Sequence, residues 1–197
     1  MSDVENKKEK IMEAALKIFK EKGAEKTSVR DIMTEAGFGL GTFYLYYTDK
    51  NDLQEKMVLN IVTEIILNAE KTCVQTDPIE RYISFVDYII DYLIAHSFEL
   101  DLLSKNITWT LYTKIENDYG LSEADSTLKF ILNKYDNLFL KNHTESQKLY
   151  ILSLTLEIMM STCKSAVLED SILSIEEMKP VLFAIIRKIF DRTGDNK

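Results

Sequence analysis

Histidine, a common general base and metal ligand, is scarce in this sequence of 197 residues. Only two histidines are present, His96 and His143, and they are too far apart along the chain to show the spacing of metal ligands. The sequence has no G-x-S-x-G motif, no P-loop and no glycine fingerprint for dinucleotides. We therefore expect no metal, no cofactor and no catalytic residue, and we expect that the protein is not an enzyme.

Cysteines and long apolar runs are also rare. Cys73 and Cys163 form no C-x-x-C pair, which fits a reducing compartment. Two small buried side chains are the favoured interpretation, and a redox-switch disulfide is the alternative. No apolar run approaches the ~20 residues of a membrane span, and the first ten residues are polar, without an apolar signal region. These absences predict a cytoplasmic protein that does not enter a membrane.

With two prolines and six glycines in a chain that is 46% hydrophobic, helix breakers are few. No segment shows the alternation of a strand, so the sequence predicts an all-α fold. Apolar spacing and end signals predict a kink or a later start near Pro180, which lies inside the last of the expected helices. The expected helices cover residues 4–22, 28–36, 39–47, 49–72, 79–96, 122–141, 145–169 and 174–191, with one or two more within 98–118.

The segment from Thr27 to Leu53 has the pattern of two short helices joined by a glycine-bearing turn. Ser28 and Asp31 have the spacing of a capping box, in which a hydroxyl and a carboxylate satisfy free backbone N–H groups. Gly37 can adopt the left-handed conformation that ends a helix. Such a unit is a helix-turn-helix, whose second helix reads the DNA major groove.

This segment resembles the TetR (tetracycline-repressor-like) family of transcriptional regulators. The resemblance covers about the first 55 residues and is carried by T-S-V-R-D-I at 27–32, A-G-F at 36–38, G-T-F-Y-L-Y-Y at 41–47 and K-x-x-L at 50–53. The preceding I-x-x-A-A-x-x-I-F at 11–19 matches as well. The resemblance implies an N-terminal three-helix helix-turn-helix domain, residues 1–50. It also implies a helical effector-binding and dimerisation domain, residues 51–197.

The resemblance further implies which residues face DNA. Phe43 and Tyr47 of the recognition helix are expected to pack inside the domain. Two positions depart from the common family pattern: Gly39 stands where a capping serine is frequent, and Leu40 where a polar or basic residue is frequent. The predicted contacts to double-stranded DNA are Ser28, Arg30, Leu40, Gly41, Thr42, Tyr44, Tyr46 and Lys50.

The net charge of −8 is unusual for a DNA-binding protein, but it is not evenly distributed. Residues 1–50 contain nine basic and nine acidic side chains, whereas residues 51–197 contain 15 basic and 23 acidic ones. The proposed DNA-binding end is therefore neutral, which allows approach to phosphate without forming a basic patch.

Aromatic residues are frequent in the second half of the sequence. Rings with a few polar groups are typical of a small-molecule pocket, and rings with carboxylates suit an organic cation. An aromatic or lipophilic cation is thus one predicted effector, and a long-chain acyl compound fits almost as well. For each ring, burial in the core is the alternative. The predicted pocket residues are Tyr82, Phe85, Tyr88, Tyr92, Trp109, Tyr112 and Glu157.

The two helices expected at 145–169 and 174–191 carry the most apolar residues. By resemblance they form a homodimer interface, and burial in the core of one chain is the alternative. A homodimer would bind a palindromic operator as a ligand-responsive repressor. The competing hypothesis is a helical enzyme or carrier whose first residues only mimic the motif. The predicted interface residues are Leu152, Met159, Met160, Cys163, Val167, Val181, Leu182, Ile185, Ile186 and Ile189.

Overall fold

The computed structural model describes residues 3–105, 130–139, 143–167 and 171–190, and within these ranges it consists of helices joined by turns and loops, with no strand. The all-α prediction is confirmed. Two compact units are present, Met1–Asn60 and Ile61–Lys197. The division between them falls inside one helix, α4 (Lys50–Thr72), ten residues beyond the division at residue 50 that the sequence predicts.

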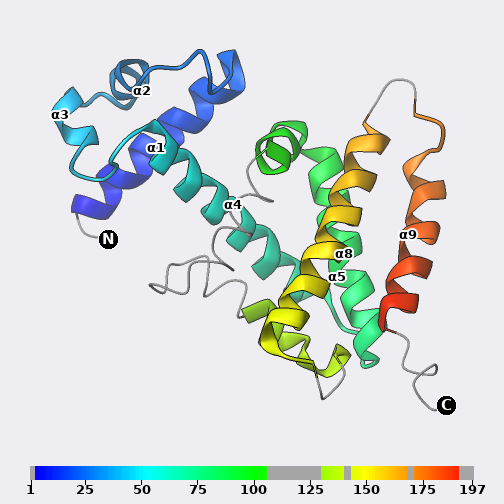
Figure 1. Ribbon diagram of the computed structural model, residues 1–197. Helices are drawn as coiled ribbons and strands as arrows, with labels where there is room; N and C mark the ends of the chain where they lie inside the picture. The colour runs from blue at the N-terminus through cyan, green and yellow to red at the C-terminus, as the bar shows by residue number, and fades with distance from the viewer. Residues whose placement is uncertain (1–2, 106–129, 140–142, 168–170, 191–197) are drawn as a thin grey trace. The chain divides into compact units, whose positions relative to one another are not determined.

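The first unit contains α1 (Asp3–Lys22), α2 (Val29–Ala36), α3 (Leu40–Phe43) and the beginning of α4 (Figure 1). Its core is a small set of buried side chains, of which the larger aliphatic and aromatic ones each contribute about 1.5–3 kcal/mol by leaving water. The predicted apolar stripe of the first helix is confirmed, since its members are buried. They are Ile11, Ala14, Ala15, Ile18 and Phe19, which share the core with Ile32, Met33, Phe43, Tyr47 and Leu53.

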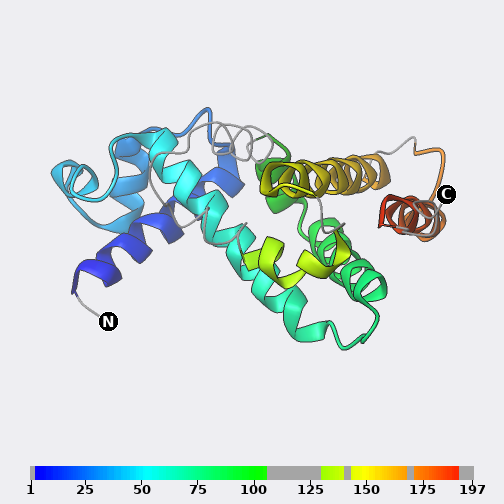
Figure 2. The same ribbon diagram turned by 60° about the horizontal axis from the view of Figure 1, so that its bottom comes forward.

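In the second unit, α5 (Pro78–Ala95), α8 (Glu145–Ala166) and α9 (Ile175–Phe190) pack against one another, as both views show (Figures 1 and 2). Residues 97–105 and 130–134 are also helical. The capping box predicted at the start of α8 is present, with the Thr144 hydroxyl accepting from the Gln147 N–H and the Gln147 side chain accepting from Thr144. Asp77 caps α5 immediately before Pro78.

Two predicted boundaries were wrong. The helix expected at 122–141 ends at 134 and is followed by a 3-10 turn, η1 (Asp136–Leu138), in which the Leu138 N–H donates to the Tyr135 carbonyl and the Phe139 N–H to the Asp136 carbonyl. The recognition helix expected at 39–47 is only α3, because the Leu45 and Tyr46 N–H groups donate to carbonyls three residues back and form turns instead of a longer α-helix. Of the two alternatives at Pro180, the later start is not seen, since α9 runs through Pro180, and the kink stays a prediction.

Candidate nucleic-acid interface

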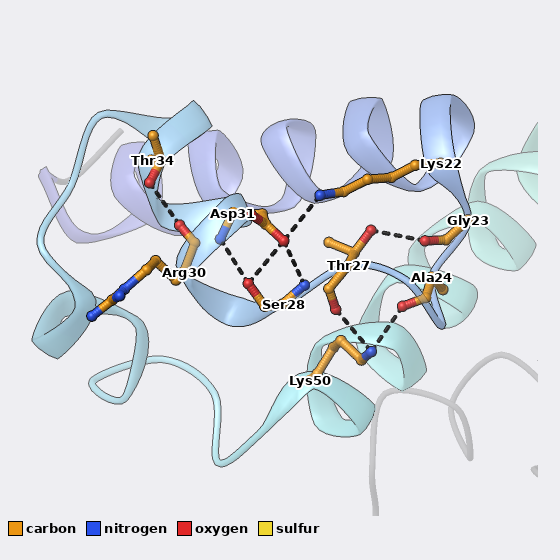
Figure 3. Close-up of polar contacts among 9 residues, drawn as sticks. All are labelled: Lys22, Gly23, Ala24, Thr27, Ser28, Arg30, Asp31, Thr34 and Lys50. Carbon is orange, nitrogen blue, oxygen red and sulfur yellow. Dashed lines mark hydrogen bonds and ion pairs between the residues drawn. The ribbon is translucent and has the colours of Figure 1, made fainter.

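A reciprocal capping box fixes the start of α2. The Ser28 hydroxyl accepts a hydrogen bond from the Asp31 backbone N–H at 3.2 Å, while the Asp31 carboxylate accepts from the Ser28 N–H and hydroxyl, both at 2.8 Å (Figure 3). Lys22, at the end of α1, pairs with the same carboxylate at 3.0 Å. The backbone bond from Ser28, followed by the bonds from Lys22 and the Ser28 hydroxyl, lowers the pKa of Asp31 to about 2. The start of α2 is thereby tied to the end of α1.

The turn between α2 and α3 depends on Gly37. Its φ of 74° lies in the left-handed region, and its N–H reaches the carbonyl oxygens of Met33 and Thr34. An added Cβ would have no heavy atom within 4 Å, so the backbone conformation rather than space favours glycine. The glycine stop predicted from the sequence is confirmed.

The outward face of α3 and the following turn is apolar and hydroxyl-bearing. Leu40 is 42% exposed, Tyr44 is 58% exposed and Leu45 is 76% exposed, while Thr42 is half-buried between them. No residue from 39 to 46 carries a charge. A surface of this kind can contact thymine methyl groups and donate or accept single hydrogen bonds, but it offers no bidentate arginine for guanine.

The inward face of the same segment is packed, as the sequence predicts. Phe43 is completely buried and Tyr47 is 1% exposed, with ring centroids 5.4 Å apart. The Tyr47 hydroxyl donates to the Lys8 carbonyl of α1 at 3.4 Å. Burial, followed by the charge of Asp52, raises the pKa of Tyr47 to about 12, so this phenol stays protonated. Tyr44 meets the edge of Phe43 at 5.4 Å, which steadies an exposed ring.

Lys50 has a structural role that the sequence did not reveal. Its Nζ donates to the carbonyl oxygens of Ala24 and Thr27, at 2.8 and 2.9 Å, and so ties the start of α4 to the turn after α1 (Figure 3). Thr27 is itself buried and donates through its hydroxyl to the Gly23 carbonyl at 2.8 Å. Two of the three Lys50 N–H groups are therefore occupied, and a phosphate contact would use the third.

The other cationic side chains of this unit, Lys56 and Arg30, differ in how many hydrogen bonds and ion pairs they make. Lys56 donates to the Tyr46 carbonyl at 3.3 Å and to Asp52 at 3.0 Å, and so supports the end of the recognition segment. Arg30 is exposed, and within the described ranges its guanidinium has no ion pair or hydrogen bond. Arg30 is thus the better placed of the predicted backbone contacts, although its role as a DNA contact stays a prediction.

The residues predicted to line a ligand pocket lie in different environments. Tyr82 and Phe85 are buried in an aromatic cluster with Tyr135, where the Tyr82 and Tyr135 ring centroids are 5.1 Å apart. Tyr82 also shares a 2.6 Å hydrogen bond with Thr155 of α8. Burial raises the pKa of Tyr82 to about 12, although that bond lowers it. These two rings are core residues of the second unit.

The remaining members of that set are less buried. Tyr88 and Tyr92 are half-buried on α5, and Tyr92 stacks on His96 with centroids 4.1 Å apart. Glu157 is exposed on α8. Trp109 and Tyr112 lie outside the described residues. A pocket shared by all seven side chains stays a prediction.

The predicted dimer residues divide into two groups. Six are buried within their own chain: Leu152, Met159, Met160, Cys163, Leu182 and Ile186. The other four remain exposed, namely Val167 at 47%, Val181 at 56%, Ile185 at 40% and Ile189 at 38%. Three of these recur every fourth residue along α9 and so share one face. A partner would therefore contact this exposed face.

The described part of the chain contains no group of His, Cys, Asp and Glu residues that could hold a metal ion. Within the same ranges, no helix is long and apolar enough to cross a membrane. Cys73 and Cys163 are both free and buried, and burial raises the pKa of Cys163 to about 12, so its thiol is unreactive near neutral pH.

Residues 11–57 match the family model described as bacterial regulatory proteins, tetR family. This match covers α1 from residue 11 onward, the capped α2, α3 and the start of α4. This segment is a TetR-family segment. The resemblance drawn from the sequence is thereby confirmed.

Two curated relatives are similar to part of this chain. The HTH-type transcriptional regulator YvdT of Bacillus subtilis, whose function is uncharacterised, is 32% identical over 135 residues, which are 65% of this chain and 66% of YvdT. An HTH-type regulator of Staphylococcus aureus is 41% identical over 51 residues, 26% of this chain and 28% of its own. The chain therefore aligns with just under two thirds of the first TetR-like relative and with less of the second.

Two solved regulator structures share the fold over most of the chain. The fatty acid degradation regulator FadR from Bacillus halodurans has a TM-score of 0.63 at 17% identity, covering 91% of this chain and 94% of FadR. FadR from Bacillus subtilis, solved in complex with stearoyl-CoA, has a TM-score of 0.61 at 16% identity and covers 90% and 96%. At these identities the likeness describes the fold alone.

Proposed function

We propose that this chain regulates transcription by binding double-stranded DNA through α3. The observation that carries the proposal is that the TetR segment separates residues that anchor it from residues that it exposes. Phe43, Tyr47 and Lys50 hold the segment in place, while Leu40 and Tyr44 remain exposed. A rigid scaffold that presents a short uncharged helix suits insertion into the major groove, where sequence is read from base edges.

The chemistry of this surface predicts how DNA is read. Leu40 and the Thr42 methyl group would contact thymine methyl groups, and the Thr42 and Tyr44 hydroxyls would bind base edges or phosphate oxygens. Arg30 would bind the phosphate backbone next to the groove. Because the segment is uncharged, we expect half-sites in which A·T pairs contribute most of the discrimination.

One short helix reads too few base pairs for useful specificity, so we infer a homodimer. The exposed face formed by Val181, Ile185 and Ile189 on α9 is self-complementary in character, as a two-fold interface requires. Two recognition helices one helical turn of DNA apart, about 34–36 Å, would read successive faces of a palindrome. Such a protein would act in the cytoplasm, where bacterial DNA lies.

The second unit would bind an effector that releases the DNA. The fold likeness to a FadR structure that holds stearoyl-CoA favours a lipophilic effector. An acyl compound and a lipophilic cation remain the two candidates, since Tyr88 and Tyr92 provide rings and Glu157 a carboxylate. A ligand that binds best to a dimer conformation whose recognition helices do not fit the operator spacing would favour that conformation, and the dimer would then leave the DNA.

The function is tested by incubating the full chain with fragments of bacterial genomic DNA and sequencing what it retains. We expect a small set of fragments that share a palindrome with A·T-rich half-sites. Retention with no shared sequence would contradict operator recognition and would favour a helical enzyme or carrier. Adding stearoyl-CoA in one arm and tetraphenylphosphonium in another should release the retained DNA in the arm that matches the effector class.

A further inference from the structure

Four exposed side chains form one stripe along the outer side of α9. Glu177, Val181, Ala184 and Lys188 follow one another at intervals of four, three and four residues, which places them on the same side of a helix. We call this set the α9 stripe. It shares Val181, which is 56% exposed, with the apolar face of the proposed dimer, and it adds one acidic and one basic side chain to that face.

The other three charged residues of α9 do not belong to this stripe. Lys179 and Arg187 form ion pairs with acidic residues of α5. Glu176 lies eleven residues before Arg187, close to three helical turns, so these two residues share a different side of α9. The charges of the stripe are therefore Glu177 near the start of the helix and Lys188 near its end.

Neither charge of the stripe is neutralised within the described part of its own chain. Glu177 accepts a hydrogen bond from the Ser174 N–H at 2.9 Å, which caps α9 but brings no positive charge. In the same ranges Lys188 makes no hydrogen bond and no ion pair, and Lys164 at the end of the neighbouring α8 forms no ion pair with Glu177. Each charge is thus available to a second chain.

Read in the reverse direction, the α9 stripe is complementary to itself. It begins with an acid, continues with a large and then a small apolar side chain, and ends with a base. A two-fold axis perpendicular to the helix brings a second copy against it in the antiparallel direction. With that axis at the middle of the stripe, Glu177 faces Lys188 of the second copy. Val181 then faces the small Ala184, which lets the two helices approach closely.

The length of the stripe suits this pairing. Glu177 and Lys188 each lie about 8 Å along the helix from its middle, and packed helices lie about 8–10 Å apart, a gap that these long side chains can span. An axis at Ile185 would centre the apolar face instead, but Glu177 would then face no residue of α9. We propose that α9 pairs antiparallel with α9 of a second copy of this chain, and that two Glu177–Lys188 ion pairs select this partner and this register. The pairing rests on the homodimer of the proposed function.

Charge reversal tests the pairing in the full chain. Glu177→Lys and Lys188→Glu should each weaken dimerisation at least about tenfold, because both contacts in each dimer change from attraction to repulsion. Mixed in equal amounts, the two variants should form heterodimers at close to the wild-type affinity, since both opposite-charge contacts return. Sedimentation of one fluorescently labelled variant, alone and in the mixture, measures these affinities, and the differences should shrink at high salt.

Two comparisons separate the pairing from the fold. Glu177→Lys also loses the bond to Ser174, but a second chain cannot repair a missing cap, so recovery in the mixture isolates the pairing. Glu176→Lys makes the same charge change on the Arg187 side of α9, and mixing it with Lys188→Glu should not restore the wild-type affinity. A wild-type dimer that neither reversal weakens would overturn the pairing and leave the homodimer standing. A wild-type monomer at micromolar concentration would overturn both.

The substitution Ile185→Cys distinguishes the two registers. A disulfide joins Cα atoms about 4.4–6.8 Å apart. In the proposed register the two copies of residue 185 lie about 7 Å apart along the helices, before the gap between the helices is added. Oxidised Ile185→Cys should therefore give no cross-linked dimer, whereas rapid cross-linking would place the axis at Ile185 and overturn the proposal.

Discussion

Polar side chains make local bonds in the first unit and long-range bonds in the second. In the first, Ser28, Asp31 and Lys50 bond chiefly to backbone groups in nearby turns and helix ends. In the second, they join helices far apart in sequence, as Arg187 does with Glu80 at 2.7 Å. The first arrangement fixes one short segment in a defined conformation, and the second holds several long helices together.

Lys179 shows the second arrangement most clearly. Its ammonium lies on α9 and pairs with Asp87 at 2.6 Å and Asp91 at 2.5 Å on α5. Burial opposes its charge, but the two carboxylates outweigh burial and raise its pKa. With these partners α9 presents Ile186 inward and Ile185 outward. The comparison teaches that a DNA-reading surface can be set by local bonds, while an association surface depends on how whole helices are oriented.

The largest expected effect comes from neighbouring residues of α9. Ile185→Glu places a charge on the exposed face, so we expect helical monomers that have lost specific DNA binding. A charge buried unpaired in a dimer interface should cost several kcal/mol of association. Ile186→Glu places the same charge in the core and should unfold the chain.

Sedimentation and circular dichroism distinguish the two outcomes. A wild-type chain that is monomeric at micromolar concentration would contradict the dimer. So would an Ile185→Glu monomer that keeps its operator affinity.

A smaller effect is expected on α3. Thr42→Ala and Tyr44→Ala should each weaken operator binding by about 1–3 kcal/mol if the proposed contacts of these side chains are direct. Neither residue is buried in the core, so the melting temperature should change little. Binding is measured by titration and stability by thermal denaturation. A fall in stability without a loss of binding would assign these residues to packing.

Arg30 and Lys50 sharpen the comparison within the first unit. Arg30→Ala should lower the slope of log K against log salt by about one per protomer, with an unchanged melting temperature. Lys50→Ala should lower the melting temperature, because it removes the bonds to Ala24 and Thr27. Its salt slope should also fall by about one if the third N–H reaches phosphate. An unchanged slope would restrict Lys50 to its structural role.

The first unit could be predicted from the sequence better than the second. Ser28, Gly37 and the buried pair Phe43 and Tyr47 were predictable, because caps, glycine turns and helical spacing are local signals. The DNA-facing positions were taken from the family motif, and they stay a prediction. The exposed Leu45 was missed, although its place in the turn after α3 is a usable signal.

The second unit resisted prediction because its contacts are long-range. Tyr82 and Phe85 have the composition of a pocket, yet Tyr135 and Phe190, which are distant in sequence, enclose Tyr82 in the core. The ion pairs of Glu70 join segments with no shared motif. The sequence also could not divide the apolar residues of α8 and α9 between core and surface, since both positions favour the same residue types.

The smallest effect concerns acid stability. The pKa of Asp31 is about 2 in the folded chain and near 3.8 without its partners, so its capping contribution is present above pH 4. That contribution is lost as the pH falls toward 2. Asp31→Asn should therefore lower the melting temperature at pH 6, and the difference from wild type should shrink between pH 4 and pH 2. A difference that stays constant with pH would show that the carboxylate charge does not contribute.

The most direct measurement compares photocrosslinking from the two units. The residue p-benzoylphenylalanine replaces Leu40 in one variant and Val74 in another, since both side chains are exposed and neither is packed in the core. Each variant is irradiated with a retained DNA fragment, and the crosslinked nucleotides are mapped. Reading of DNA by α3 predicts crosslinks from position 40 to bases within each half of the palindrome and none from position 74. Equal crosslinking from both positions, or none from position 40, would contradict the proposal that α3 reads DNA.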